Sequence, residues 1–214
     1  MRATGVVVPV MAAITVYAQS PAITPHSIVN AASFMSPAPP GGPIASAAAG
    51  DSVLRDYGRL PLVFEPNQGQ ADPEVKFLAR ALGGTLFLTE REAVLGPVRV
   101  RLVGAGKPQA VRGLEPTGGI SNYFIGDNPA RWRTHIPHYS RVEYKSMYAG
   151  VDMVYYGNPQ KLEYDLVVAP GADPAAIRME YEGVESLRVD ADGDLVLRTA
   201  SGELRQKRPR ARLA

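Results

Sequence analysis

The 214-residue chain has no cysteine. This absence excludes disulfides, a thiol nucleophile, thiolate metal sites and a lipid-modified cysteine behind a cleaved leader. The formal net charge is only +2, so no strong overall field favours nucleic acid or an anionic membrane as partner. The motifs of P-loop, Rossmann, zinc-hydrolase and nucleophile-elbow enzymes are also missing, and the common hydrolase and nucleotide-binding classes are therefore not indicated.

Long apolar runs and long helical patterns are missing as well. Beyond the N-terminus, no segment approaches the roughly 18 apolar residues of a transmembrane helix. Proline and glycine are plentiful, at 19 and 21 residues, which favours short elements joined by many turns. The chain is therefore predicted to be all-β, and not an α/β protein with the nucleotide site that such folds carry.

The first 56 residues predict export followed by a linker. Arg2 precedes the mostly apolar run 3–16, and small residues stand at the −3 and −1 positions before Gln19. This layout predicts a signal peptide over residues 1–18 and hence a secreted or cell-surface protein. Residues 19–56 are rich in Pro, Ala, Ser and Gly, a composition typical of a disordered linker. A weak strand signal lies within it at 28–34.

Residues 57–210 carry the pattern of a β domain. In Val98–Val103, Val and Leu alternate with Arg, and in Leu162–Val168 every second residue is apolar. This period of two indicates strands with one buried face. Turn signals recur every eight to twelve residues, so we expect an antiparallel, β-sandwich-like single domain of about ten short strands. Residues 104–119 are expected to form a loop with one short strand near 111–114, followed by strands at 121–125 and 139–145.

The stretch Ser121–Asp165 holds nine of the sixteen aromatic residues, including the only tryptophan. Such a density is typical either of a β core or of a surface on which a ligand stacks. A second feature is the polar loop between Pro66 and Pro73, whose amides either satisfy the loop backbone or contact a ligand. The candidate binding residues are Trp132, Tyr139, Tyr155, Tyr156, Asn67 and Gln68.

Metal sites are not predicted. His135 and His138 stand three residues apart, but Pro137 prevents the helix that would bring both onto one zinc, even with Asp127 or Asp152 nearby. We therefore expect exposed loop histidines.

The acidic run Asp190, Asp192, Asp194 resembles a calcium loop, yet its glycine falls at the fourth position and no glutamate follows at the twelfth. A hairpin turn is predicted there, with calcium as the alternative, and no cofactor is expected.

Catalysis is not predicted either. The acids available for glycoside hydrolysis are Glu65, Asp152, Glu163 and Asp165. Glu163 and Asp165 would share a strand face about 7 Å apart, a spacing that suits an inverting pair. Alternating polar residues on a wet sheet face give the same spacing without any chemistry.

Residues 205–214 form a basic tail, with five cations between Arg205 and Arg212. This tail would bind acidic polymers or remain solvated, and export makes nucleic acid an unexpected partner.

Several long runs resemble a known family. LPLVFEPNQGQAD at 60–72, YAGVDMVYYG at 148–157 and LEYDLVVAPGADP at 162–174 occur in this order. The chain resembles, over about residues 57–210, the N-terminal domain of unknown function of large exported bacterial proteins that carry β-propeller (SBBP) repeats. The resemblance implies a surface or secreted multidomain protein and no catalytic residues. In that family further sequence and the repeats follow the segment matching 202–204, so a truncated reading frame or a stand-alone remnant is expected.

The expected function is therefore a non-catalytic structural or interaction module of an exported cell-surface protein, normally N-terminal to β-propeller repeats. Its partners would be other surface modules or polysaccharide. The alternative is a carbohydrate-binding module that uses Trp132 and the nearby tyrosines, and a glycoside hydrolase-like enzyme comes third.

Overall fold

A computed structural model describes residues 6–9, 27–35 and 60–213 of the chain. The regular secondary structure of these residues is almost entirely strand, in agreement with the all-β prediction. The strands are β1 (Val6–Pro9), β2 (Ser27–Met35), β3 (Phe64–Pro66), β4 (Val75–Ala81), β5 (Gly84–Thr89), β6 (Glu92–Leu95), β7 (Val98–Val103), β8 (Ala110–Tyr123), β9 (Arg133–Tyr148), β10 (Val151–Asn158), β11 (Lys161–Val168), β12 (Arg178–Glu182), β13 (Ser186–Val189), β14 (Leu195–Thr199), β15 (Gly202–Gln206) and β16 (Arg210–Leu213). Two 3-10 turns, η1 (Pro129–Arg131) and η2 (Pro174–Ala176), interrupt them.

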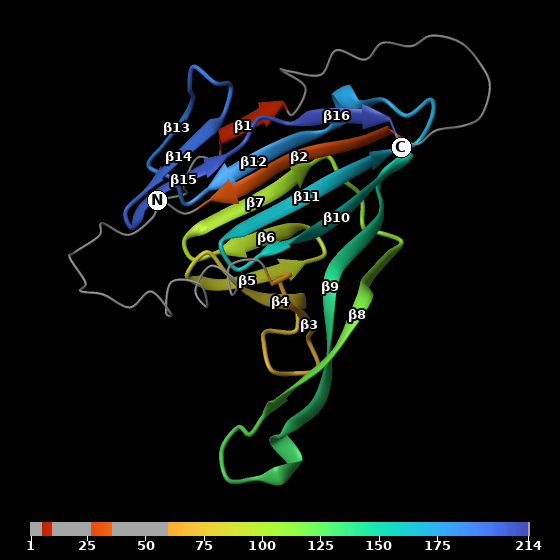
Figure 1. Ribbon diagram of the computed structural model, residues 1–214, viewed down its shortest axis with the longest axis vertical. Helices are drawn as coiled ribbons and strands as arrows, with labels where there is room; N and C mark the ends of the chain where they lie inside the picture. The colour runs from red at the N-terminus through yellow and green to blue at the C-terminus, as the bar shows by residue number, and fades with distance from the viewer. Residues whose placement is uncertain (1–5, 10–26, 36–59, 214) are drawn as a thin grey trace, which may run out of the picture.

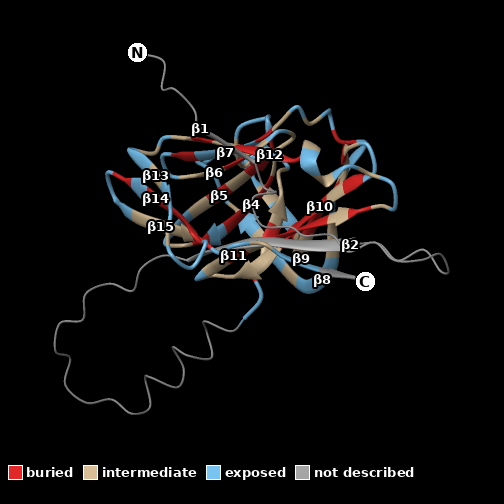
Figure 2. Cartoon of the chain, turned by 90° about the horizontal axis from the view of Figure 1, so that it is seen from above, coloured by how far each residue is buried: buried red, intermediate tan, exposed pale blue. Residues whose placement is uncertain are grey.

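All strand pairs are antiparallel and belong to one continuous sheet that curls on itself (Figure 1). The strand order is β1-β12-β7-β6-β5-β4-β3-β9-β10-β11-β2-β15-β14-β13, with β8 added beside β9 and β16 beside β2. Seen from above, the wall that contains β5, β6, β7 and β12 faces the wall that contains β11 and β15 across the buried residues (Figure 2). The all-β, sandwich-like prediction is confirmed, with more strands than expected.

The period-two pattern explains which residues form the core. In β11, Leu162, Tyr164, Leu166 and Val168 are all buried, as their spacing predicted. Met179 and Tyr181 of β12 follow the same rule from the opposite wall. Removing these side chains from water is the main stabilising term of such a small sandwich, since each large apolar side chain contributes about 1.5–3 kcal/mol when fully buried.

The core also contains a polar contact between the two walls. The Tyr181 hydroxyl donates to Gln206 Oε1 at 2.6 Å, and Gln206 Nε2 donates to the Tyr164 hydroxyl at 3.0 Å. All three residues are buried, so burial raises the pKa of both tyrosines. Because a buried polar group must find a partner, this trio ties Gln206 of β15 to Tyr164 of β11 and Tyr181 of β12.

Parts of the predicted leader and linker belong to the sheet. Val6–Pro9, within the predicted signal peptide, forms β1 and pairs with β12. Residues 27–35, which contain the weak strand signal of the predicted linker, form β2 between β11 on one side and β15 and β16 on the other. The rest of both predicted segments lies outside the described residues. None of the helical turns in the described part is long and apolar enough to cross a bilayer.

The largest difference from the sequence prediction is the hairpin of β8 and β9. The loop expected over 104–119 gives way to a 14-residue strand from Ala110 onward, and the strand expected at 139–145 begins at Arg133. The distal half of this hairpin projects beyond the curled sheet (Figure 1). Glycine permits the close packing at its base, because a Cβ on Gly113 would lie 2.3 Å from the Tyr139 ring. Gly113 therefore serves strand packing within the stretch that was expected to be a loop.

Candidate functional site

The end of the projecting hairpin carries a pair of exposed aromatic side chains. Phe124 follows β8 and Trp132 precedes β9, and their rings meet edge to face with centroids 5.1 Å apart. Phe124 is 65% exposed and Trp132 37% exposed. Exposed aromatic side chains at the end of a projection are typical of contact sites. Trp132 falls between the strands expected at 121–125 and 139–145, and in the structure it lies outside the strands, between η1 and β9.

Local hydrogen bonds hold this tip in one conformation. The indole Nε1 of Trp132 donates to the Gly126 carbonyl at 3.0 Å. Asn128 caps η1 by accepting the Ala130 N–H at 3.0 Å, and Pro129 begins the turn. Because these bonds hold the indole and the turn in place, little conformational freedom remains to be lost when a partner binds.

The two faces of the distal hairpin differ in character. Ile120, Asn122 and Phe124 are exposed, whereas the intervening Ser121 and Tyr123 are half-buried. Both intervening side chains reach Glu65 of β3. Since successive strand residues point to opposite faces, one face attaches the hairpin to the body and the other stays open to solvent.

The attachment is a four-residue polar cluster at the neck of the hairpin. The Ser121 hydroxyl donates to Glu65 Oε1 at 2.9 Å, and the Tyr123 hydroxyl donates to Glu65 Oε2 at 2.7 Å. His138 Nε2 lies 2.7 Å from Ser121 Oγ. Burial, together with the hydrogen bond to Glu65, raises the pKa of Tyr123 to about 12.

This neck cluster contains a serine next to a histidine, but its order differs from that of a hydrolase triad. In a triad the carboxylate orients the histidine from the ring nitrogen opposite the serine. Here Glu65 bonds to the serine itself, and Nδ1 of His138 packs against Gly119, where a Cβ would lie only 2.6 Å away. The geometry suits a structural clamp between β3, β8 and β9.

The polar loop between Pro66 and Pro73, which follows β3, packs against the hairpin. The Asn67 Nδ2 donates to the carbonyls of Ala71, Asp72 and Val75, and its Oδ1 accepts the N–H groups of Gly69 and Ala71. A Cβ on Gly69 would lie 2.8 Å from Arg133 Nε, so this loop packs against the hairpin at Arg133, the residue that follows Trp132. The amide of Asn67 is thus committed to the loop backbone, while Gln68 is exposed.

The three tyrosines predicted with Trp132 do not gather around it. Tyr155 is buried in the core, where it meets Tyr144 and Tyr164. Tyr139 packs edge to face on Phe77. Tyr156 donates to the buried carboxylate of Asp165 on the sheet face opposite to Tyr155 and Tyr164, beneath the guanidinium of Arg141. Of the two interpretations of this aromatic stretch, the structure supports core packing for most of its rings.

The histidines do not form a metal site. Both lie within β9 rather than in a loop, with His135 exposed and His138 half-buried in the neck cluster. In the part of the chain that the structure describes, no three His, Asp or Glu side chains come together in a manner suited to a metal ion.

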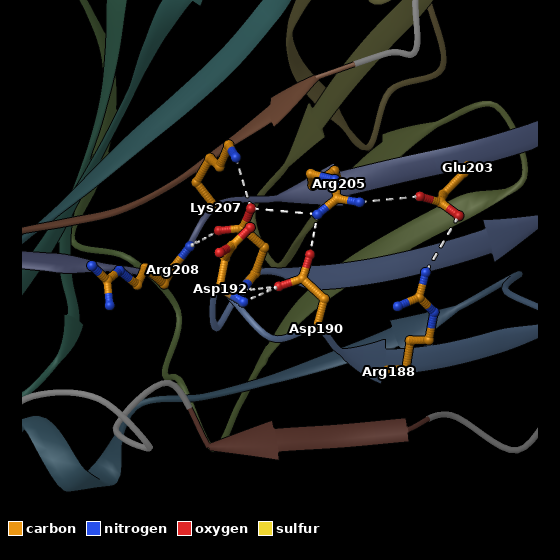
Figure 3. A network of polar contacts seen from close by, with 8 residues as sticks. Arg188, Asp190, Asp192, Glu203, Arg205, Lys207 and Arg208 are labelled. Atoms are coloured by element: carbon orange, nitrogen blue, oxygen red, sulfur yellow. Dashed lines mark hydrogen bonds and ion pairs between the residues drawn. The ribbon is translucent and has the colours of Figure 1, made fainter.

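The acidic run forms the predicted hairpin turn between β13 and β14, and cations from β15 and the segment after it neutralise the turn (Figure 3). Asp190 Oδ1 accepts the N–H groups of Asp192 and Asp194, each at 3.0 Å. Arg205 bonds to Asp190 and Lys207 Nζ donates to Asp194 Oδ2 at 2.7 Å. A calcium ion would have to displace these bonds.

The charges in this acidic turn also perturb one another. Burial disfavours ionisation of Asp194, but Lys207, the Arg208 N–H and Arg205 outweigh it and hold the pKa of that carboxyl below its ordinary value. The same balance holds for Asp190. Burial favours its neutral form, but the hydrogen bonds from backbone N–H groups and the charge of Arg205 outweigh burial and lower the pKa of that carboxyl. The first residues of the predicted basic tail are therefore partners of this turn and belong to β15 and the segment after it.

The acids considered for glycoside hydrolysis are engaged elsewhere. Glu163 pairs with Lys161 at 2.8 Å, and Asp165 accepts the hydrogen bond from Tyr156. Asp152 accepts from Lys145 Nζ at 2.6 Å, and Glu65 belongs to the neck cluster. No two of these four carboxylates line either the cleft at one end of the sandwich or the small apolar cavity in the core.

A cleft of about 320 Å³ lies at one end of the sandwich, between the β4–β5, β6–β7 and β14–β15 turns. Its apolar wall includes Leu95, Val98 and Leu204, which also border a small apolar cavity in the core. Thr199, Ser201 and Glu203 supply its polar side. None of the predicted binding residues lines this cleft.

Comparison with known proteins places the chain within one family. A family model described as a domain of unknown function, DUF7948, matches residues 95–211, more than half of the chain. This match confirms the resemblance to a domain of unknown function, and it covers the projecting hairpin. No curated protein matches the chain. No solved structure matches it either.

Proposed function

The chain belongs to the DUF7948 family of domains of unknown function, and from that premise we propose that it is a non-catalytic interaction module of an exported, cell-surface protein. The observation that carries the proposal is the exposed ring pair of Phe124 and Trp132 on a buttressed hairpin. A few residues carry most of the energy in protein contacts, and tryptophan is among the most frequent of them. Aromatic side chains suit this role because they remove large apolar areas from water. A rigid projection presents them with little ordering cost.

The wider setting of the module follows from the sequence resemblance. We propose that the domain normally stands before β-propeller repeats in a longer exported protein. The signal-peptide layout of residues 1–18 supports export, and the long matching runs at 60–72 and 148–157 support the link to repeat proteins. The coding sequence downstream of this chain tests the second part: a search in all frames should find the repeats.

The interaction role is tested by binding to the envelope of the producing cells. We expect the full chain to be retained on isolated envelopes, and Phe124→Ser to lower retention about tenfold because the main apolar contact is lost. Val189→Ser is the matched control, since Val189 is 62% exposed on β13, away from the hairpin. Equal loss in both variants would refute a specific role for the tip.

Carbohydrate binding is a second candidate, favoured by the exposure of Trp132. Indole rings bind sugars by stacking on their apolar faces. The perpendicular arrangement of Phe124 and Trp132, at 90°, does not offer the coplanar platform that stacks several sugars. Affinity gels loaded with polysaccharide separate the two candidates: retardation that Trp132→Ala abolishes would favour carbohydrate, and unchanged mobility on every gel would exclude it.

A further inference from the structure

We propose that the open face of the hairpin pairs with the same face of a second copy of this chain, forming a weak symmetric dimer. This inference rests on the proposed function, because it assigns a partner to the same tip. Three features of the described residues lead to it: the size of the apolar stripe, the polar apex beyond it, and two charges that complement each other only across a twofold axis.

The stripe is the row of exposed apolar residues on the open face. Ile120 is 51% exposed, and Phe124 and Trp132 extend the row toward the tip, with Ile125 at 39% beside them. From the size of such side chains, the four expose roughly 350 Å² of apolar surface, within the range of the largest patches on monomers. Two such faces together would bury about 700 Å², which is below the size of stable interfaces and suits a weak one.

The polar apex argues against insertion into a bilayer. Beyond the aromatic pair, the chain continues as Gly126-Asp127-Asn128-Pro129-Ala130-Arg131, and every one of these residues is exposed. An end-on approach to a membrane would bury the Asp127 and Arg131 charges before the rings reached apolar surroundings. The apolar stripe therefore suits a contact made side-on, by the face of the hairpin.

The charges of the apex point to a second copy. Asp127 lies on the β8 side of the tip and Arg131 on the β9 side, and both are exposed. Throughout the described ranges, no ion pair or side-chain hydrogen bond involves either of them. A twofold axis parallel to the hairpin, in the plane between two facing hairpins, sets the β8 edge of one copy against the β9 edge of the other. Each Asp127 then faces the partner's Arg131, and each Phe124 faces the partner's Trp132, as a self-complementary interface requires.

The test is the self-association of the full chain in solution, measured by sedimentation equilibrium from about 10 µM to about 1 mM, the range of weak complexes. We expect the average mass to rise toward twice that of the monomer as concentration increases. Phe124→Ser should weaken association at least about tenfold, whereas Val189→Ser should leave it unchanged. Trp132 is the only tryptophan, so its emission should shift to the blue over the same concentration range.

A charge exchange tests the symmetry directly. Asp127→Arg or Arg131→Asp alone places like charges together twice per dimer and should weaken association at least about fivefold. The double variant restores opposite charges at both contacts and should recover association to within about twofold of the original chain. All these positions are exposed, so the circular dichroism of each variant should match that of the original.

In these measurements the dimer would be overturned by a monomer at every concentration, by single exchanges without effect, or by a double exchange that fails to recover association. Retention on envelopes is measured at protein concentrations well below those at which the dimer forms, so its outcome does not depend on dimerisation. A monomeric chain whose retention still depends on Phe124 would refute the dimer and leave the proposed function intact. Blue-shifted Trp132 emission with lipid vesicles alone would refute the dimer in favour of a membrane contact.

Discussion

Replacing Glu65 by leucine should loosen the hairpin from the body of the protein. Glu65 is the acceptor of the neck cluster, at 2.9 Å from Ser121 Oγ and 2.7 Å from the Tyr123 hydroxyl. Leucine fills a similar volume and accepts neither bond. The substitution therefore removes the clamp without leaving a cavity.

The expected cost follows from these two bonds. A hydrogen bond to a charged acceptor contributes about 1.5–3 kcal/mol. Both hydroxyls are only half-buried, so in the variant water replaces part of each lost bond. Leucine also removes the free-energy cost of holding a carboxylate partly out of water. We expect Glu65→Leu to lower the free energy of unfolding by about 2–3 kcal/mol. Glu65→Gln keeps the shape and both polar positions and should cost about 1 kcal/mol.

Two probes of urea unfolding separate local from global effects. Far-ultraviolet circular dichroism follows the whole sheet, and fluorescence of Trp132 follows the hairpin tip alone. The two transitions should coincide in the original chain and separate in Glu65→Leu, with the fluorescence change at lower urea. Burial is the larger cause of the raised pKa of Tyr123 and Glu65 the smaller, so in this variant that pKa should fall from about 12 but stay above 10.

Glu185→Leu is the matched control, because Glu185 is exposed and its one ion pair within the described residues, to Arg198, is 3.9 Å long. Such a pair contributes little, so a change below about 0.5 kcal/mol is expected. If Glu65→Leu shifted the urea midpoint no more than this control, or if its two transitions stayed coincident, the neck cluster would not be the clamp.

Gly113→Ala should cost about 2 kcal/mol in thermal unfolding, because its Cβ would lie 2.3 Å from the Tyr139 ring. In a chain that already carries Tyr139→Ala, the same substitution should cost almost nothing. If the costs of the two substitutions simply added in the double variant, the contact would be contradicted. Gln206→Ala removes the Gln206 hydrogen bonds of two buried tyrosine hydroxyls, which keep only the weak acceptor Met179 Sδ, and should cost about 2–4 kcal/mol in urea unfolding. The lowered pKa values of Asp190 and Asp194 stabilise the fold above the unfolded-state pKa. Stability should therefore fall as pH drops below about 4, and asparagine at both positions should flatten this dependence.

The alternation of apolar and polar residues determined the fold class by itself. Because side chains point to opposite faces of a strand in turn, the spacing of Leu162, Tyr164, Leu166 and Val168 identified the buried face of β11 without any structure. Turn chemistry did the same for Asp190–Asp194, whose glycine at position 193 has a φ of +81°. Trp132 was likewise recognisable as lying between strands, because Pro129 prevents an uninterrupted strand there.

The sequence pattern could not reveal contacts that join distant segments. Glu65 and Ser121 are separated by 56 residues, and only the path of β3 beside β9 brings them together. The length of the β8–β9 hairpin was hidden for a related reason: Gly113 and Gly119 indicate a loop locally, but the tertiary structure uses both for close approach to the Tyr139 and His138 rings. Local chemistry therefore determined the fold class and many of the strands and turns, while only the tertiary structure decided the length of the β8–β9 hairpin, which aromatics are buried and that Phe124 and Trp132 stand exposed together.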